Sequence, residues 1–209
     1  MARGRAAGYD DQREMILAKA ARLFAQRGYP ATSMNVVAQA CGLSKATLYH
    51  YYRDKYALLV SIAEGHVTRL EALVDEIVAQ RLAPADELRT LILRIVAEYA
   101  GAQDAQRVLT GDVRFLTDAD RARIMATERR VVAGFARAIA AWQPAKAEAG
   151  LATPLTMLLF GMINWLFTWL KPDGGLSHEA IAPIVADLFT GGVPAVKPPP
   201  VRTPADHGA

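Results

Sequence analysis

The chain has 209 residues, of which 52% are hydrophobic, and a formal net charge of +3. This length and apolar fraction can bury one substantial core or two small ones, which excludes an unfolded chain. The single cysteine, Cys41, excludes an intrachain disulfide framework and favours a cytoplasmic location. The N-terminal stretch MARGRAAGYDDQ lacks an apolar core, so no secretory signal is expected.

The charge is unevenly distributed along the chain. Residues 1–55 hold nine Lys or Arg against four Asp or Glu, a net of +5, whereas residues 56–209 hold 15 against 17, a net of −2. Only the N-terminal segment is therefore suited to a polyanion. Residues 1–9 are interpreted as a flexible basic arm, either in contact with DNA or without a fixed role.

The first helix is predicted to begin after Asp10 or Asp11, with Asp11 and Glu14 as a capping box. Its apolar residues recur at helical spacing and predict one buried face. The residues on that face are Ile16, Leu17, Ala20, Leu23 and Phe24.

Residues 32–55, TSMNVVAQACGLSKATLYHYYRDK, predict two short helices joined by a tight turn. Ser33 is placed to cap the first helix, and Gly42 supplies the residue that tolerates positive φ at its end. Leu43 fills the corner, and Ser44 is placed to cap a second helix that ends near Tyr51. This punctuation is typical of a helix-turn-helix element.

The second of these helices displays hydrogen-bond donors rather than apolar side chains. Lys45, Thr47, Tyr49 and His50 would lie on its outer face, and the small Ala46 allows close approach to a groove wall. The sequence therefore predicts a DNA-reading surface. The alternative is a helical hairpin in an ordinary bundle with a solvated polar face.

Nearly every later segment has a helical period, so the sequence predicts an all-α protein. Asp54 and Ser177 are further cap residues, and Pro144 and Gly150 are expected to break the chain. The helices are expected at about 55–81, 84–99, 103–116 (broken), 117–142, 153–171 and 177–190.

The run from Leu155 to Leu170 is the most hydrophobic, but its 16 residues fall short of the roughly 20 needed to cross a bilayer. It is interpreted as a buried helix without a membrane role. This helix and the closing one carry more apolar surface than one domain needs, which favours a homodimer through a four-helix bundle of the last two helices. The alternative is a central helix inside a monomer.

An arginine-rich stretch accompanies aromatic residues in the C-terminal part, which suits an anionic amphiphilic effector. The alternative is that these arginines form the solvated face of a helix and that the aromatic residues are core or dimer contacts. The candidate effector-binding residues are His66, Arg107, Arg114, Phe115, Arg121, Met162, Trp165 and Trp169.

The sequence contains no catalytic constellation. Its four histidines are scattered, and it has neither a glycine-rich phosphate loop nor a cysteine pair. We therefore expect no enzyme activity, no metal and no cofactor.

The N-terminal part resembles the tetracycline-repressor-like transcription regulators across residues 12–59. The resemblance implies phosphate contacts at Ser33, Thr47, Tyr49 and Lys55 and base-reading positions at Lys45, Ala46 and His50; Ser44 and Tyr51 are included in the DNA-binding set. The residues that carry it are Phe24, Gly28, Tyr29, Thr32, Ser33, Val37, Ala38, Gly42, Ser44, Lys45, Thr47, Leu48, Tyr49, Tyr51, Tyr52, Lys55, Leu58 and Leu59.

The C-terminal pair of helices is similar to a subset of that family that regulates fatty-acid, steroid or aromatic-acid catabolism, in particular to regulators of phenylacetate degradation. The residues concerned are Gly161, Asn164, Trp165, Trp169, Lys171, Pro172, Gly174, Leu176 and Ser177. The resemblance implies a homodimeric repressor that binds a palindromic operator in double-stranded DNA and is released by phenylacetyl-CoA or a related acyl- or aryl-CoA thioester. The alternatives are an efflux regulator with a different apolar ligand and an architectural DNA binder that ignores ligands.

Four regions are expected on this basis. They are a basic arm (1–9), a helix-turn-helix domain (10–56), an effector-binding and dimerisation domain (57–192) and a disordered proline-rich tail (193–209).

Overall fold

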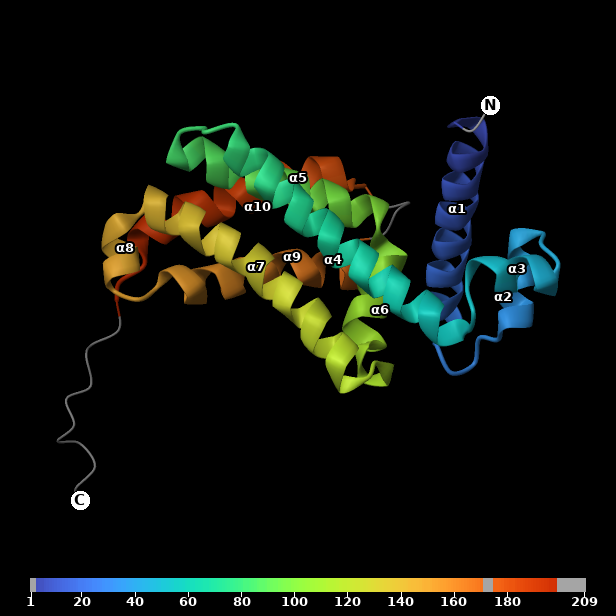
Figure 1. Ribbon diagram of the computed structural model, residues 1–209. Helices are drawn as coiled ribbons and strands as arrows, with labels where there is room; N and C mark the ends of the chain where they lie inside the picture. Colours follow the sequence, from blue (N-terminus) through green and yellow to red (C-terminus); the bar gives the residue numbers. More distant parts are fainter. Residues whose placement is uncertain (1–2, 171–174, 199–209) are drawn as a thin grey trace, which may run out of the picture. The chain divides into compact units, whose positions relative to one another are not determined.

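The computed structural model describes residues 3–170 and 175–198, and these residues contain helices and no strands (Figure 1). The predicted all-α class is confirmed. No helix among them is long and apolar enough to cross a membrane. The α-helices are α1 (Arg3–Arg27), α2 (Met34–Cys41), α3 (Lys45–Tyr51), α4 (Lys55–Ala79), α5 (Pro84–Gly101), α6 (Gln103–Gly111), α7 (Asp118–Trp142), α8 (Pro144–Glu148), α9 (Ala152–Trp169) and α10 (His178–Gly192), and two 3₁₀ turns are η1 (Val113–Phe115) and η2 (Val193–Ala195).

The chain forms two compact units. The first comprises residues 1–73 and 98–131, and the second comprises residues 74–97 and 132–209. The helix-turn-helix element therefore belongs to a larger unit than the predicted domain of residues 10–56, because most of α4, all of α6 and the first half of α7 accompany it.

Helix α1 begins earlier than the sequence predicted. It starts at Arg3, so Asp11 and Glu14 lie inside it, and the predicted start and capping box are wrong. Helical backbone also replaces the flexible arm over residues 3–9. The physical reason is that Ala6 and Ala7 have high helix propensity and that no proline lies between Arg3 and Asp10, although Gly4 and Gly8 are poor helix formers.

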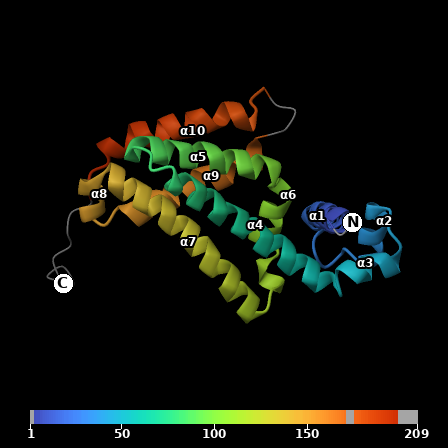
Figure 2. The same ribbon diagram turned by 45° about the horizontal axis from the view of Figure 1, so that its top comes forward.

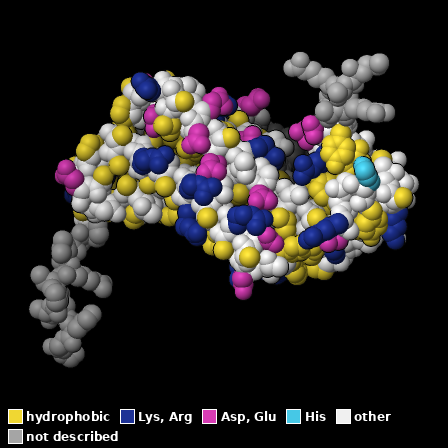
Figure 3. All heavy atoms as spheres, in the orientation of Figure 1, with side chains coloured by type: hydrophobic (Ala, Val, Ile, Leu, Met, Phe, Trp, Pro, Cys, Tyr) yellow, Lys and Arg dark blue, Asp and Glu magenta, His cyan; other side chains and the backbone are white. Residues whose placement is uncertain are grey.

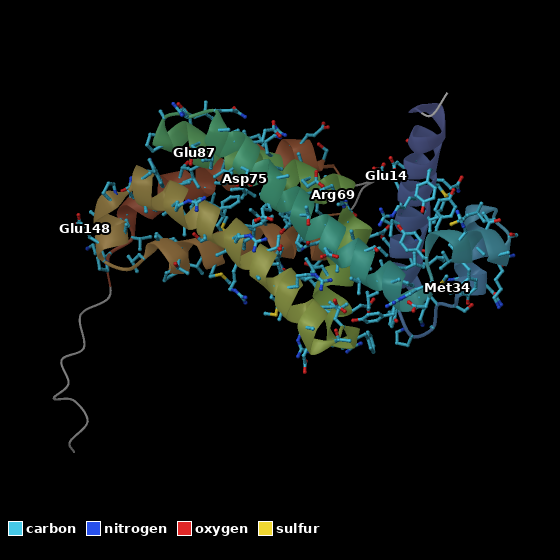
Figure 4. All side chains as sticks on the ribbon, in the orientation of Figure 1. Glu14, Met34, Arg69, Asp75, Glu87 and Glu148 are labelled. Atoms are coloured by element: carbon cyan, nitrogen blue, oxygen red, sulfur yellow. The ribbon has the colours of Figure 1, made fainter. Side chains whose placement is uncertain are left out.

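The core of the first unit forms where α1, α2, α3, α4 and α6 bury their apolar faces. Phe24 of α1, Leu48 of α3 and Leu58 of α4 are fully enclosed, as the helical spacing of the sequence indicates. Met34, labelled in Figure 4, is buried at the start of α2. Both ribbon views place α1 beside α2 and α3 (Figures 1 and 2), so α1 supports the helix-turn-helix element.

Ion pairs join α4 to α7 within the first unit. Arg123 Nε lies 2.8 Å from Glu64 Oε1, and Arg130 contacts Glu71 one heptad further along both helices. The two helices therefore run in the same direction with matched register. Figure 3 shows Lys/Arg and Asp/Glu side chains intermingled on this face of the molecule, so no surface of one charge forms there.

The second unit contains the last three α-helices. The predicted breaks at Pro144 and Gly150 are confirmed, because α7 ends at Trp142 and Gly150 takes φ 71° before α9. The short helix α8 between them was not predicted; it forms because Pro144 occupies the first helical turn, where the missing N–H costs nothing. The predicted disordered tail begins instead with η2, whose Val193 is buried. Residues 199–209 of that tail lie outside the described residues.

Candidate DNA-binding and effector sites

The turn between α2 and α3 forms as the sequence predicted. Ser33 Oγ accepts a hydrogen bond from Val36 N (3.4 Å) at the start of α2. Gly42 ends α2 with φ 68°, and the Leu43 N–H donates to Ala38 O (2.9 Å), which satisfies a terminal carbonyl. Ser44 Oγ accepts from Thr47 N (3.0 Å) and caps α3. Four local signals therefore fix the angle at which α3 leaves α2.

Helix α3 has only one fully buried side chain, Leu48, which anchors it to the core. The opposite face is exposed over its whole length and carries an ammonium, a hydroxyl, a phenol and an imidazole. The exposed residues are Lys45, Ala46, Thr47, Tyr49 and His50. The Lys45 ammonium lies 5.8 Å from the centroid of the Tyr49 ring, so these two donors are neighbours. The structure thus brings the predicted base-reading positions together on one exposed face.

Lys55 makes contacts that the sequence analysis did not include. Its Nζ donates to Tyr29 O (2.7 Å) and Pro30 O (3.3 Å) and lies 4.3 Å from the centroid of the Tyr29 ring. The neighbouring Asp54 caps α4 by accepting from Ala57 N (2.7 Å). Lys55 therefore joins α4 to the α1–α2 loop, and two of its three ammonium donors are engaged within the protein.

Two α1 side chains contact the end of α3. The Tyr9 ring stacks on Tyr51 with centroids 4.7 Å apart, and Arg13 Nε donates to Tyr52 Oη (3.1 Å). Burial raises the pKa of Tyr52, and the Arg13 hydrogen bond opposes that rise. Tyr51 is half-buried, unlike the other candidate residues of α3. Sequence reasoning missed Tyr9 and Arg13, because the only available signal was their four-residue spacing.

Cys41 is half-buried at the end of α2. Burial raises the pKa of its thiol, so the thiol is protonated at neutral pH. This agrees with a structural role.

The predicted effector residues divide between the two units. His66, Arg107, Arg114, Phe115 and Arg121 lie in the first unit, and Met162, Trp165 and Trp169 lie in the second. Arg107 and Arg114 are exposed, and the Arg114 guanidinium lies 5.0 Å from the centroid of the Phe115 ring. Arg121 pairs with Asp118 on its own helix. The arginines of this stretch therefore lie at the surface, as the alternative reading of a solvated helix face required.

His66 has the most unusual environment of the eight. Its exposed fraction is 0%, and Nε2 lies 2.7 Å from Gln106 Oε1, which assigns the N–H to Nε2 because an amide oxygen only accepts. Nδ1 is buried without a partner among the described residues, and burial lowers the pKa of the imidazole. The neutral ring therefore leaves one lone pair unused in the core. An unsatisfied polar atom of this kind costs roughly 1–3 kcal/mol.

A phenol, that of Tyr99, and a carboxyl group, that of Glu128, also belong to the first unit. The Tyr99 ring centroid lies 5.8 Å from that of His66, and burial raises the pKa of the Tyr99 phenol. Burial also raises the pKa of Glu128, whose charge disfavours ionisation of Tyr99. His66, Gln106 and Tyr99 thus form a polar cluster in the core of the first unit, and the half-buried Glu128 acts electrostatically on Tyr99.

Helices α9 and α10 expose large apolar side chains. Trp165 is 66% exposed and Leu188 is 65% exposed, whereas Met162 is half-buried. We define the α9–α10 face by its exposed apolar residues, which are Met157, Leu158, Trp165, Trp169, Ile184 and Leu188. Leu158, Trp165 and Trp169 are separated by seven and four residues on α9. Ile184 and Leu188 are separated by four on α10, so each helix presents an apolar stripe.

A capped helix pair with an exposed donor face, on an all-helical framework, defines a DNA-binding protein of the helix-turn-helix class. Within the described residues, no three His, Cys, Asp or Glu side chains are grouped so as to hold a metal ion.

Two family models match this chain. Residues 16–62 match the bacterial regulatory proteins of the tetR family, and residues 81–193 match the tetracyclin repressor-like C-terminal domain. The chain belongs to the TetR family of transcription regulators, so the predicted resemblance to that family is confirmed. The members of this family are regulators and not enzymes.

Solved structures share the fold of this chain. A TetR-family regulator from Bordetella parapertussis is 32% identical, with a TM-score of 0.80 over 88% of this chain and 97% of that chain. AibR, solved in complex with isovaleryl coenzyme A and operator DNA, is 30% identical, with a TM-score of 0.71 over 85% of this chain and 97% of that chain.

Matches to curated relatives are shorter. The transcriptional repressor KstR2 of Rhodococcus jostii is 29% identical over 114 residues, which are 54% of this chain and 56% of that protein. The chain spans about half the length, or less, of the first curated relatives it matches.

Proposed function

We propose that this protein is a homodimeric repressor that binds a palindromic operator through α3 and is released by an acyl- or aryl-CoA thioester. The observation that carries the DNA-binding part is the exposed donor face of α3, where Lys45 and His50 are free to meet base edges. Lysine binds the acceptors of guanine in the major groove, and hydroxyl groups such as those of Thr47 and Tyr49 donate to phosphates. Ser33 would donate its hydroxyl to a phosphate from the start of α2.

The homodimer is supported by the α9–α10 face. Exposed tryptophan and leucine side chains on these stripes are costly in water, and a second copy of the same face would cover them in a two-fold arrangement. Two-fold symmetry places the two α3 helices on inverted half-sites, which is why a palindromic operator is expected.

The effector class is supported by a relative and by the core of the first unit. AibR is solved with isovaleryl coenzyme A, which makes an acyl thioester the first class to test, with phenylacetyl-CoA as the leading compound. His66 Nδ1 needs a donor, and the pantetheine arm of coenzyme A carries amide N–H groups. The exposed Arg114 suits a phosphate of the same ligand.

The proposed coupling between effector and operator uses α4. This helix carries Lys55, which contacts the α1–α2 loop, and His66, eleven residues further along. An effector that binds at His66 and displaces α4 would move the helix-turn-helix element and change the separation of the two α3 helices. The effector loosens DNA binding only as far as it prefers the DNA-incompetent state.

The DNA-binding part is tested by selection of bound duplexes from a random library at moderate ionic strength. The expected product is an inverted repeat, and it defines the operator used in the experiments below. Recovery of sequences with no shared motif would contradict this part of the proposal.

The effector part is tested by adding acyl- and aryl-CoA thioesters, beside their free acids, to the protein–operator complex. A regulator of this kind releases the duplex and gains thermal stability with its thioester, because a ligand that binds the native state raises the melting temperature. Release by apolar compounds without coenzyme A would favour an efflux regulator, and a complex that ignores every ligand would favour an architectural binder. His66→Leu is expected to abolish release, whereas Arg94→Ala, at the exposed ion pair with Glu76, is the matched control.

A further inference from the structure

Three aromatic rings meet where α1 passes the end of α3. The Tyr9 and Tyr51 rings are stacked, with centroids 4.7 Å apart and planes at 26°. The His50 ring stands edge-on to both: it is 6.4 Å from Tyr9 at 88° and 5.7 Å from Tyr51 at 84°. Stacked and edge-to-face geometries are the two favourable arrangements of aromatic pairs. His50 is thus held by two tyrosines from different helices.

Only the N-terminal extension of α1 brings Tyr9 to this position. Because α1 begins at Arg3, Tyr9 lies one helical turn before Arg13 on the same face. Arg13 donates to Tyr52 while Tyr9 stacks on Tyr51, so two successive turns of α1 hold two successive residues at the end of α3. Had the helix begun at Asp11, Tyr9 would have no fixed place.

The contact bears on DNA recognition because His50 and Tyr9 are both at the surface. His50 is exposed and Tyr9 is 41% exposed, so the cluster is open on the side that α3 presents. An exposed imidazole on a helix ordinarily samples several rotamers, and fixing one on binding costs conformational entropy. A ring that already holds the imidazole in one orientation reduces that cost for the bases that fit it.

We propose that Tyr9 is a specificity-determining positioning residue, which fixes the orientation of His50 for reading the operator. The proposal rests on the proposed function, because it takes α3 as the reading helix. It assigns to the start of α1 a role in base discrimination and not only in phosphate attraction.

The test compares binding of the selected operator with binding of duplexes changed at single base pairs. Tyr9→Ala is expected to lower discrimination roughly 3- to 10-fold, at the same base pairs that His50→Ala affects. Tyr9→Phe keeps the ring and is expected to behave as the wild type. Gln26→Ala, at an exposed uncharged position of the same helix, is the matched control and is expected to change nothing.

A double-mutant cycle separates positioning from a general loss of binding. Tyr9→Ala combined with His50→Ala is expected to lose no more discrimination than His50→Ala alone, because Tyr9 acts through His50. Additive losses, equal weakening of every duplex by Tyr9→Ala, or a Tyr9→Phe variant that behaves like Tyr9→Ala would each overturn the proposal.

Nuclear magnetic resonance of the free protein tests the contact without DNA. The His50 ring protons are expected to shift in Tyr9→Ala, through loss of the tyrosine ring current, and to stay in place in Gln26→Ala. Unmoved His50 resonances in Tyr9→Ala overturn the positioning role by itself. If the His50 resonances do shift in Tyr9→Ala but the wild-type protein selects no duplex, the contact is correct and the proposed function is wrong.

Discussion

The α3 surface and the α9–α10 face are both exposed, but they differ in what water does to them. On α3, the side chains of Lys45, Thr47 and His50 keep their hydrogen bonds to water, so the isolated surface is stable. On the α9–α10 face, the apolar surfaces of Trp165 and Leu188 make no hydrogen bonds to water, and their exposure costs free energy. The first surface is therefore suited to a polar partner that comes and goes, and the second to a partner that stays.

The difference also concerns how each surface is held. A single buried residue, Leu48, and the Ser44 cap position α3, whereas α9 buries apolar side chains such as Leu159 and Ile163 along its inner face. A helix with one anchor keeps most of its surface available to a partner, which suits a reading element. A helix with a long buried face is a rigid base for an interface.

The largest effect is expected from a charge on the α9–α10 face. Leu188→Arg should prevent dimerisation, because a buried unpaired charge costs several kcal/mol, and should weaken operator binding by at least about a hundredfold. Sedimentation velocity at micromolar concentration measures the first and a gel-shift titration the second. Met125→Arg, an exposed apolar position on α7, is the control and should stay dimeric. A dimeric Leu188→Arg would place the partner surface elsewhere.

The next effect concerns the α3 surface. Lys45→Ala should cost about 1–3 kcal/mol at one base pair of each half-site and should relax the preference there. Binding of operator variants by fluorescence anisotropy measures this change. Lys19→Ala removes a charge from an exposed position of α1 and should leave base preference intact. Uniform weakening by Lys45→Ala would make Lys45 a phosphate contact instead.

Lys55→Ala should act on both stability and DNA binding. Loss of the hydrogen bonds to Tyr29 O and Pro30 O should lower the free energy of unfolding by about 1–2 kcal/mol. Loss of one phosphate contact should reduce the slope of log affinity against log salt by about 0.9. Urea unfolding and salt titration measure the two separately. Lower stability with an unchanged slope would leave Lys55 with a structural role alone.

A pH effect is expected from the polar cluster of the first unit. Burial lowers the pKa of His66 below its ordinary 6.5. Just below pH 6.5, His66 is therefore protonated in the unfolded chain but still neutral in the folded protein. Stability should therefore be lost as pH falls below about 6.5, by at most about 1.4 kcal/mol per pH unit.

The measurement is urea unfolding between pH 5 and pH 8, with His66→Leu as the comparison. The raised pKa of Glu128 acts in the opposite sense at lower pH, so the difference between the two proteins isolates His66. Parallel pH profiles would mean that folding leaves the pKa of His66 unchanged.

The smallest effect is expected from adding a methyl group at Gly134, where α7 packs closely against α4. A Cβ on Gly134 would lie 2.5 Å from Val74 Cγ1, and valine has little rotamer freedom in a helix, so Gly134→Ala should destabilise by about 1 kcal/mol. A Cβ on Gly65 would meet only the flexible tip of Arg69, at an ordinary contact distance of 3.7 Å, so Gly65→Ala should stabilise by a similar amount. Equal melting temperatures for the two variants would contradict this packing.

The sequence predicted the helix-turn-helix element closely because its signals are local. Ser33, Gly42 and Ser44 each act on backbone groups within a few residues, so their effect is readable without the fold. The start of α1 has no such marker, and the predicted capping box at Asp11 was misleading. Helix α8 was missed for a similar reason, since Pro144 is compatible both with a break and with a helix start.

Features that depend on distant residues were out of reach. Nδ1 of His66 has no hydrogen-bond partner among the described residues, because Gln106, forty residues away in sequence, contacts only Nε2. The Tyr9 cluster likewise requires α1 to lie against α3. Lys55 was identified as a DNA contact through resemblance, and its contacts to the α1–α2 loop appear only in the folded chain.

The central claim is that two copies, joined through their apolar faces, present two α3 helices to one inverted repeat. Native mass spectrometry of the protein with the selected operator tests it most directly. We expect a complex of two protomers with one duplex. When one half-site is scrambled, we expect this complex to decrease strongly, with no complex of one protomer in its place. One protomer on the intact operator, or undiminished binding to the half-scrambled duplex, would contradict the claim.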